Sequence, residues 1–300
     1  MNSPITVEAL MVLDAIDERG SYAAAAGKLN KVPSALSYIM QKLEEQLDVT
    51  LFQRQGRRSV LTPAGKHLLV EGRNILLAIN KLSEQTQIIA NGWEPKIRIA
   101  IDSIFDGMDV FPIINQFLIE HPNIEIDISE EVLNGTWEVL IDDQVDLIIG
   151  ASAPVPPQKG IASQPMASNE MAFYVNKTHP LMSCQTPLSN DDIANFVTVV
   201  VHDSAKTAIP KSIGLIENSQ HLYVATLEHK IKAIISGLGC GFLPKKRVQS
   251  YVQQGVLIAL ETEEIKAPDE LVIAWKLVNR GKGLQRLREL LKNANLAGVF

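Results

Sequence analysis

The chain has 300 residues, 46% of them hydrophobic and 21% charged, and a formal net charge of -6 at pH 7. This length predicts two or three domains, and the acidic balance argues against a protein that coats nucleic acid over its whole surface. The N-terminus lacks the basic start and apolar run of a secretory signal, and no uncharged apolar stretch approaches the roughly 20 residues of a membrane helix, so we expect a cytoplasmic protein without a membrane partner.

Basic residues are concentrated near the N-terminus. From Arg19 to Lys66 the chain has eight Lys or Arg residues and three Asp or Glu residues, which gives +5 for this segment and leaves -11 for the rest. A basic module joined to an acidic body is typical of a protein that reads duplex DNA.

Two helices are predicted in the first 30 residues. Thr6 is a suitable N-cap for the first helix and Gly20 ends it, while Ser21 is a suitable N-cap for the second. One face of the second helix has mostly small apolar side chains, which let a crossing helix approach closely. This face consists of Tyr22, Ala25, Ala26 and Leu29.

A third helix is predicted after a short turn at residues 30–32. Pro33 suits its first position, and apolar residues then recur at the spacing of a buried stripe. The stripe consists of Leu36, Ile39, Leu43 and Leu47, and the opposite, polar face consists of Ser34, Ser37, Tyr38, Gln41 and Lys42. Polar side chains of these types hydrogen-bond base edges and phosphates, so this helix-turn-helix is a candidate DNA-reading unit.

Two strand-like runs, Thr50–Arg54 and Ser59–Thr62, predict a β-hairpin wing. Their connection contains Gly56, Arg57 and Arg58, and guanidinium groups bind phosphate through paired hydrogen bonds. The composition of this tip therefore favours contact with a DNA backbone.

A long helix is predicted after the wing. It begins at Thr62-Pro63 and runs to about Ala90, roughly 40 Å at 1.5 Å per residue, before Asn91-Gly92 ends it. A helix of this length on a small domain cannot bury its apolar stripe alone. We therefore expect it to pair with a second copy of the chain.

From Lys96 onward, strands alternate with helices. This alternation predicts a parallel sheet with right-handed crossovers and, after the prolines at 154–157, a second α/β series. We expect two α/β lobes that the chain connects near Pro165 and Pro268. The expected strands are 96–101, 124–130, 146–150, 171–175, 197–201, 223–225 and 271–276, and the expected helices are 111–120, 136–141, 226–237 and 282–292.

Several short motifs occur in a specific order and spacing. They are Gly20-Ser21-Tyr22, Ala25-Ala26, Leu29, Ser34-Ala35-Leu36-Ser37, Ile39, Leu43-Glu44, Leu51-Phe52, Arg54, Leu61-Thr62-Pro63-Ala64-Gly65 and the later segment 237–244. Together they closely resemble the LysR-type transcriptional regulator family. The motifs are concentrated in the first 90 residues, and the total length extends the resemblance through most of the chain.

The resemblance implies a winged helix-turn-helix DNA-binding domain at 1–62, a linker and dimerisation helix at 63–92, and a two-lobed α/β effector-binding domain at 93–300 that resembles periplasmic binding proteins. Lobe 1 is expected at about 93–164 and 268–300, and lobe 2 at about 165–267. The implied function is transcriptional regulation, as activator or repressor, under the control of a small-molecule effector. The implied partners are double-stranded DNA with an inverted repeat, the effector and further copies of the chain in tetramers of two dimers, and RNA polymerase is a further candidate.

The candidate DNA contacts are Ser21, Lys31, Ser34, Ser37, Tyr38, Arg54, Arg57 and Arg58. The family commonly has Ser or Thr capping the recognition helix and Gln near its start, whereas this chain has Val32 and Pro33, so other polar residues must carry more of the contact. Packing of Tyr38 against a neighbouring helix, and an ordinary solvated run of arginines in the wing, are the alternatives.

In open α/β sheets, ligands lie beyond the carboxyl ends of the strands, and the resembling family has its effector contacts there. The residues at these positions are Asp102, Ser103, Ile104, Glu130, Glu131, His202, Asp203, Thr226 and Leu227. Asp106 and Asp109 add further carboxylates. Several carboxylates near one cleft favour a cationic or amine-bearing effector, and acids that face solvent or cap helices are the alternative.

Other classes of function find little support. The chain has no Gly-x-Ser-x-Gly, His-Glu-x-x-His or phosphate-loop motif, and its histidines have no clear metal-ligand spacing, so we expect no enzyme activity, metal or cofactor. Cys184 and Cys240 are expected to be reduced thiols, and cysteine-based redox sensing is the alternative to effector control. A solute-binding protein without DNA function would leave the basic N-terminal module unexplained.

Overall fold

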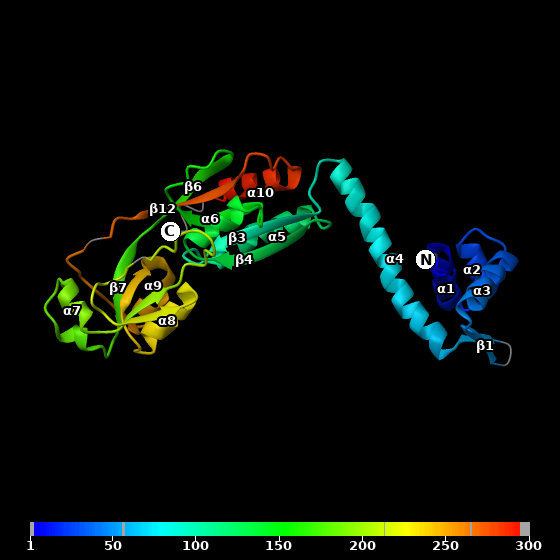
Figure 1. Ribbon diagram of the computed structural model, residues 1–300, viewed down its shortest axis with the longest axis horizontal. Coiled ribbons are helices and arrows are strands. Elements are labelled where there is room, and N and C mark those ends of the chain that lie inside the picture. The colour runs from blue at the N-terminus through cyan, green and yellow to red at the C-terminus, as the bar shows by residue number, and fades with distance from the viewer. Residues whose placement is uncertain (1–2, 56–57, 213, 265, 295–300) are drawn as a thin grey trace. The chain divides into compact units, whose positions relative to one another are not determined.

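The computed structural model describes residues 3–55, 58–212, 214–264 and 266–294. The chain forms two units that divide between Asn91 and Gly92. The first unit contains the predicted helix-turn-helix and the long helix, and the second contains both α/β lobes (Figure 1). Within the described ranges, no helix is both long enough and apolar enough to cross a membrane.

The N-terminal unit begins with α1 (Val7–Arg19), α2 (Tyr22–Lys28) and α3 (Pro33–Leu47). The Thr6 hydroxyl accepts a hydrogen bond from the Ala9 N–H (3.1 Å), which confirms the predicted N-cap of α1. The predicted Ser21 cap of α2 is also confirmed. Buried side chains from all three helices share one hydrophobic core.

The predicted wing and long helix are both present. The wing consists of β1 (Phe52–Gln55) and β2 (Arg58–Leu61), which pair as antiparallel strands. The long helix is α4 (Pro63–Ala90), and the Thr62 hydroxyl caps it by accepting a hydrogen bond from the Gly65 N–H (3.0 Å).

Ion pairs connect α4 to α1. The Arg73 guanidinium of α4 lies 2.7 Å from a carboxylate oxygen of Asp14 and 2.9 Å from one of Asp17. C-terminal to Arg73, large apolar side chains of α4 are exposed in the single chain, and these are Ile75, Leu77, Leu82 and Ile89. The helix therefore has apolar surface that its own unit does not cover.

Lobe 1 contains a five-stranded sheet in the order β4-β3-β5-β12-β6. The predicted parallel arrangement is confirmed for β3, β4 and β5, whereas β12 is antiparallel to both β5 and β6. The sheet is mixed because β12 returns from lobe 2. It lies between β5 and β6 and runs in the opposite direction to both. The strands are β3 (Lys96–Asp102), β4 (Glu125–Glu131), β5 (Leu147–Ser152), β6 (Ile161–Asn169) and β12 (Asp269–Lys276), and the helices are α5 (Phe111–Glu120), α6 (Asn134–Ile141) and α10 (Lys282–Asn293).

The chain leaves lobe 1 later than the sequence predicts. β6 continues through Pro165 to Asn169 and pairs with β12 along its whole length. Pro165 has no N–H to donate, but the register shifts beside it, between Leu271 and Val272, and such a bulge accommodates proline within a sheet. Residues 165–169 therefore belong to the sheet of lobe 1.

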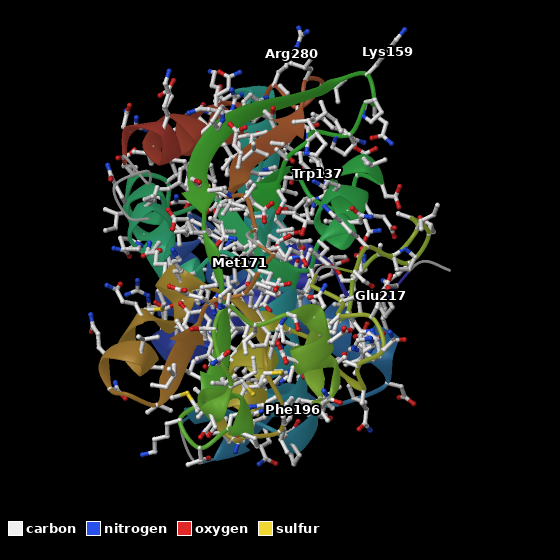
Figure 2. The ribbon with its side chains drawn as sticks, turned by 90° about the vertical axis from the view of Figure 1, so that its left-hand side faces the viewer. Trp137, Lys159, Met171, Phe196, Glu217 and Arg280 are labelled. Carbon is white, nitrogen blue, oxygen red and sulfur yellow. The ribbon has the colours of Figure 1, made fainter. Side chains whose placement is uncertain are left out.

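Lobe 2 is built around β7, which pairs antiparallel with β10 and β11, while β8 and β9 form a parallel pair. Backbone hydrogen bonds of Cys240 to Val197 and Val199 connect β8 to the start of β10. In the view of Figure 2, Met171, the first residue of β7, lies between Trp137 of lobe 1 and Phe196 of lobe 2. The strands are β7 (Met171–Asn176), β8 (Thr198–Val201), β9 (His221–Val224), β10 (Gly241–Pro244) and β11 (Leu257–Leu260), and the helices are α7 (Asn190–Ala194), α8 (Leu227–Ile235) and α9 (Lys245–Gln253).

Gly65→Ala is expected to destabilise the N-terminal unit. A Cβ atom at Gly65 would lie 2.2 Å from the backbone carbonyl oxygen of Leu51, which cannot move without shifting the wing. We expect a loss of about 1–3 kcal/mol in the free energy of unfolding, measured by chemical denaturation. Gly27→Ala is the control, because nothing lies within 4 Å of a Cβ atom there and alanine favours helix. Equal stability of the two variants would contradict the close approach at Gly65.

Candidate functional site

The exposed face of α3 is the first candidate site. Ser34, Ser37 and Lys42 are exposed, and the Tyr38 side chain is 65% exposed and is not part of the helical core. Tyr38 is therefore not a core residue of the single chain. The face combines hydroxyl groups with one cation, and its side chains are accessible to a DNA groove.

The other predicted DNA contacts have different surroundings. Ser21 is exposed and caps α2, and the Lys31 ammonium lies 2.7 Å from the Glu8 carboxylate, so Lys31 would have to exchange this partner to bind phosphate. In the wing, Arg54 lies in β1 and Arg58 lies in β2. Arg57 lies outside the described residues.

The second candidate site is a small cavity of about 60 Å³ between the two lobes. From lobe 1 it is lined by Asp102, Ser103, Ile104, Val132 and Leu133, and from lobe 2 by Met171, Val201, Leu227, Lys230, Phe242 and Pro244. Most of these side chains are apolar, and two are ionisable. A concave, mostly apolar site with a few polar groups is typical of small-molecule binding.

Asp102 is a buried acid at the end of β3. It is 3% exposed, and its carboxylate accepts hydrogen bonds from the Thr136 hydroxyl (2.6 Å) and the Ile104 N–H (3.0 Å). Burial raises the pKa of Asp102 to about 7, and the two hydrogen bonds oppose this rise only in part. Asp102 therefore exchanges its proton near neutral pH.

Lys230 is a buried base on α8, and it is 4% exposed. A Cβ atom at Gly241 would lie 3.5 Å from its Nζ atom, so the ammonium group lies against the backbone of β10. Burial lowers the pKa of Lys230 to about 8. Within the described part of the chain, this Nζ has no carboxylate partner within 4.0 Å and donates no hydrogen bond.

Four predicted effector residues line the cavity, and these are Asp102, Ser103, Ile104 and Leu227. Their role in effector binding stays a prediction. Five others do not line it, and these are Glu130, Glu131, His202, Asp203 and Thr226. Glu130 is exposed, the exposed His202 stacks on the Tyr223 ring with centroids 5.0 Å apart, and the Thr226 hydroxyl caps α8.

Glu131 and Asp203 instead belong to a junction between the lobes. Ser204 of lobe 2 donates its hydroxyl hydrogen to the Glu131 carboxylate (2.7 Å), and its oxygen accepts a hydrogen bond from the Val132 N–H (2.9 Å). The Asp203 carboxylate accepts backbone hydrogen bonds from both lobes, and the donors are Asn134, Gly135, Ala205 and Lys211. This carboxylate is therefore occupied by the protein's own N–H groups.

Glu138 makes the reciprocal contact from lobe 1. Its carboxylate accepts hydrogen bonds from the N–H groups of Ala208 (2.9 Å), Lys206 (2.9 Å) and Thr207 (3.1 Å) in lobe 2. These N–H groups lower the pKa of Glu138 to about 2.

A second set of contacts joins α9 of lobe 2 to the loop after β3. The Arg247 guanidinium donates from Nη1 to the carbonyl oxygens of Ser103 (2.8 Å) and Phe105 (2.9 Å). It also lies 3.7 Å from Asp106, and the Lys246 ammonium lies 3.0 Å from Asp109. Asp106 and Asp109 therefore have cationic partners and do not make the cavity acidic, contrary to the sequence-based hypothesis.

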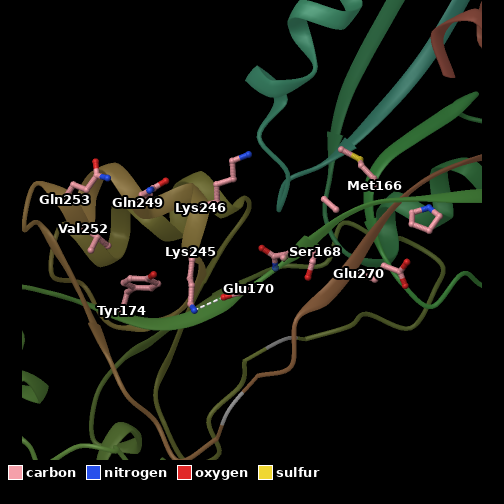
Figure 3. Close-up of a pocket in the computed structure, with 13 residues that line it drawn as sticks. Met166, Ser168, Glu170, Tyr174, Lys245, Lys246, Gln249, Val252, Gln253 and Glu270 are labelled. Carbon is pink, nitrogen blue, oxygen red and sulfur yellow. Dashed lines mark hydrogen bonds and ion pairs between the residues drawn. The ribbon is translucent and has the colours of Figure 1, made fainter. Parts of the chain in front are cut away.

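A larger groove of about 1080 Å³ also lies between the lobes (Figure 3). Gln249, Val252 and Gln253 of α9 line one side, and strands β6 and β12 line the other. An ion pair crosses it, with the Lys245 ammonium 2.8 Å from the Glu170 carboxylate. Because this groove is wide and both of its lysines, Lys245 and Lys246, pair with carboxylates, the smaller cavity is the better candidate for a small ligand.

The two cysteines are free thiols, Cys184 exposed and Cys240 buried. Burial raises the pKa of Cys240 to about 12, which suppresses the reactive thiolate. Among the residues that the structure describes, no three His, Cys, Asp or Glu side chains are grouped as metal ligands. The surroundings of Cys240 do not favour redox sensing over effector control.

Sequence reasoning missed Lys230, although its spacing is informative. Leu227, Ile231 and Ile234 form the buried stripe of α8, and Lys230 lies three residues after Leu227 on the same face. A lysine at such a position either extends its ammonium group to solvent or buries it. The tertiary structure distinguishes these cases, and here the side chain as a whole is 4% exposed.

Two family profiles match the chain. Residues 7–66 match the bacterial regulatory helix-turn-helix protein of the lysR family, and residues 90–295 match the LysR substrate binding domain. The first match contains α1 to β2, and the second contains both lobes.

Full-length relatives agree with these profiles. The chain is 35% identical over 292 residues to the HTH-type transcriptional regulator YhaJ of Escherichia coli O157:H7, with 97% of each chain covered. It is 32% identical over 295 residues to the uncharacterized HTH-type transcriptional regulator YeeY of Escherichia coli K12, with 98% of this chain and 96% of the relative covered. A cysteine mutant of OxyR from Corynebacterium glutamicum has a TM-score of 0.62 at 18% identity, with 98% and 93% covered, and supports the fold alone.

Asp102→Asn is expected to flatten the dependence of stability on pH. With its raised pKa, Asp102 stabilises the fold fully below its ordinary value of 3.8, and this contribution is lost as the pH rises through about 7. The melting temperature of the wild type should therefore fall more steeply between about pH 5 and about pH 7.5 than that of the Asp102→Asn variant.

Differential scanning calorimetry measures this difference in slope. Asp142→Asn is the matched control, because Asp142 is an exposed acid of the same lobe, and its slope should equal that of the wild type. If the Asp102→Asn variant also kept the wild-type slope, Asp102 would not be a buried acid with a raised pKa.

Proposed function

The chain belongs to the LysR family of bacterial transcriptional regulators, and from this membership we propose that its dimer reads an inverted repeat in promoter DNA through two copies of α3. The protein is a DNA-binding regulator with an effector-binding domain, and the family consists of regulators and not of enzymes. The half-sites should lie about one helical turn apart, or a multiple of it, because two-fold symmetry of the protein must match the site.

The observation that carries this proposal is the exposed polar face of α3 within a basic module. Tyr38 and the hydroxyls of Ser34 and Ser37 lie on the side of α3 that the core does not use. A recognition helix inserts such a face into the major groove, where base edges offer donors and acceptors. Ser21 and Lys31 are proposed to contact the DNA backbone beside it.

The wing is proposed to contact phosphate. Arg54 and Arg58 lie on its two strands, and Arg57 precedes Arg58 in the sequence. Arginine binds phosphate through two parallel hydrogen bonds, which position a protein on DNA without reading its sequence.

The exposed apolar side chains of α4 support dimerisation. Leu77 and Leu82 are 66% and 64% exposed in the single chain, and burial of such side chains against a second α4 would be favourable. We propose that two dimers form a tetramer, that the DNA-bound protein contacts RNA polymerase, and that it acts in the cytoplasm.

The effector is proposed to bind in the cavity between the lobes. Asp102, Ser103, Ile104 and Leu227 line this cavity together with the buried Lys230. Binding would shift the population between arrangements of the lobes, which requires different affinities for the two arrangements. The charges of the cavity give no support to the cationic effector that the sequence favoured, since Asp106 and Asp109 pair with cations of α9.

Tyr38→Ala is expected to weaken specific DNA binding by about 1–3 kcal/mol, the typical cost of a lost base contact. Gel retardation with a fragment from the genomic surroundings of the coding sequence measures this change. Val278→Ala, which removes a 75% exposed apolar side chain from the second unit, is the control and should leave affinity unchanged. Full affinity of the Tyr38→Ala variant would exclude Tyr38 from the DNA contact.

Arg57→Ala is expected to weaken binding to specific and unrelated DNA alike and to reduce the dependence of affinity on salt concentration. A phosphate contact releases counterions regardless of base sequence, so the change should not alter the ratio of specific to non-specific binding. Titrations at several salt concentrations measure the slope, and an unchanged slope would exclude Arg57 from phosphate contact.

A further inference from the structure

The cavity between the lobes contains a buried cation without a counter-charge. Lys230 is 4% exposed, and in the described part of the chain its Nζ atom has no carboxylate within 4.0 Å and no hydrogen-bond acceptor. Burial of an unpaired ammonium group is costly, and proteins normally pair such a group or use it for binding. Lys230 therefore has an unused capacity to bind an anion.

The neighbourhood of Lys230 favours an anionic ligand over a cationic one. A second cation, Lys266, lies with its Nζ atom 5.0 Å from the centroid of the Phe242 ring, which lines the cavity, and this cation pairs with Glu264 at 2.7 Å. The acid on the opposite wall, Asp102, directs its carboxylate to the Thr136 hydroxyl and the Ile104 N–H of its own lobe. Burial raises the pKa of Asp102 to about 7, and its protonated form does not repel an anion.

The size and walls of the cavity limit the ligand further. A volume of about 60 Å³ has room for about four waters, at roughly 15 Å³ each. The side chains of Leu133, Met171 and Phe242 make much of the wall apolar. A doubly charged group such as phosphate would leave one charge uncompensated in these surroundings, whereas a carboxylate matches the single charge of Lys230.

From these contacts we infer that Lys230 determines effector specificity and that the effector is a small monocarboxylate whose anionic group binds the Lys230 ammonium. The apolar part of the molecule would lie among the side chains of lobe 1 and lobe 2. This inference rests on the proposed function only in taking the cavity as the effector site. It replaces the positively charged effector of the sequence-based hypothesis with one of opposite charge.

The test uses the full-length protein in calorimetric titrations and thermal-shift measurements. The probes are the linear carboxylates from acetate to pentanoate, benzoate, and the amide and amine with the carbon skeleton of propanoate. We expect at least one carboxylate to bind and to raise the melting temperature. Propanamide and propylamine should bind at least about tenfold more weakly than the best carboxylate, because neither offers a negative charge.

Two substitutions of Lys230 and one matched control complete the design. Lys230→Met and Lys230→Gln should each lower carboxylate affinity at least about tenfold. Lys232→Met should not, because Lys232 lies on the same helix but is exposed and pairs with Glu228 at 3.2 Å. Without ligand, Lys230→Met should raise the melting temperature, since it removes an unpaired buried charge.

Three binding results would overturn the inference. They are tighter binding of propylamine than of every carboxylate, absence of binding by all carboxylates, and wild-type carboxylate affinity in both Lys230 variants. Melting temperatures of both variants below that of the wild type would also overturn it, because Lys230 would then stabilise the fold. Gel retardation without ligand tests the DNA-binding function separately, so a regulator with a different effector would be distinguished from a protein that does not bind DNA.

Discussion

The contact between the two lobes of the effector-binding unit depends on carboxylates of each lobe that accept hydrogen bonds from backbone N–H groups of the other. Asp203 of lobe 2 accepts hydrogen bonds at the start of α6 in lobe 1, and Glu138 of α6 accepts hydrogen bonds from residues 206–208 of lobe 2. Hydrogen bonds to a charged acceptor are about twice as strong as neutral ones, and here they pair N–H groups that would otherwise need water. The protein itself therefore stabilises the contact between its lobes, and a ligand does not have to create it.

This arrangement also explains which charges remain for a ligand. Asp203 and Glu131 are engaged in the contacts between the lobes, and Asp106 and Asp109 lie beside cations of α9. The many acids near the strand ends thus do not act on the cavity together. Its charge is set by two buried groups, Asp102 and Lys230, and each has a pKa displaced toward its neutral form.

Local sequence patterns predicted those parts of the fold that depend on interactions between residues close together in the sequence, such as helix caps. The caps at Thr6, Ser21 and Thr62 and the periodic apolar stripes gave α1 to α4 with ends close to those observed. β10 and β11 were missed, although the equally short β8 and β9 were predicted. Gly241 and Pro244 weaken the strand pattern of β10, and the path of β6 was missed because a bulge compensates for Pro165. The strand ends near the cavity were predictable, but the partner of each side chain was not, because partners come from distant segments such as α9.

Val132 takes part both in the lining of the cavity and in the contact between the lobes. Its side chain lines the cavity, while its N–H and carbonyl groups both hydrogen-bond with Ser204 of the other lobe. A ligand that displaces this side chain therefore also displaces the Val132 backbone. The hydrogen bonds between Val132 and Ser204, which join the two lobes, are then affected directly. A substitution at position 204 would consequently change the strength of the response to an effector without changing any residue that lines the effector cavity.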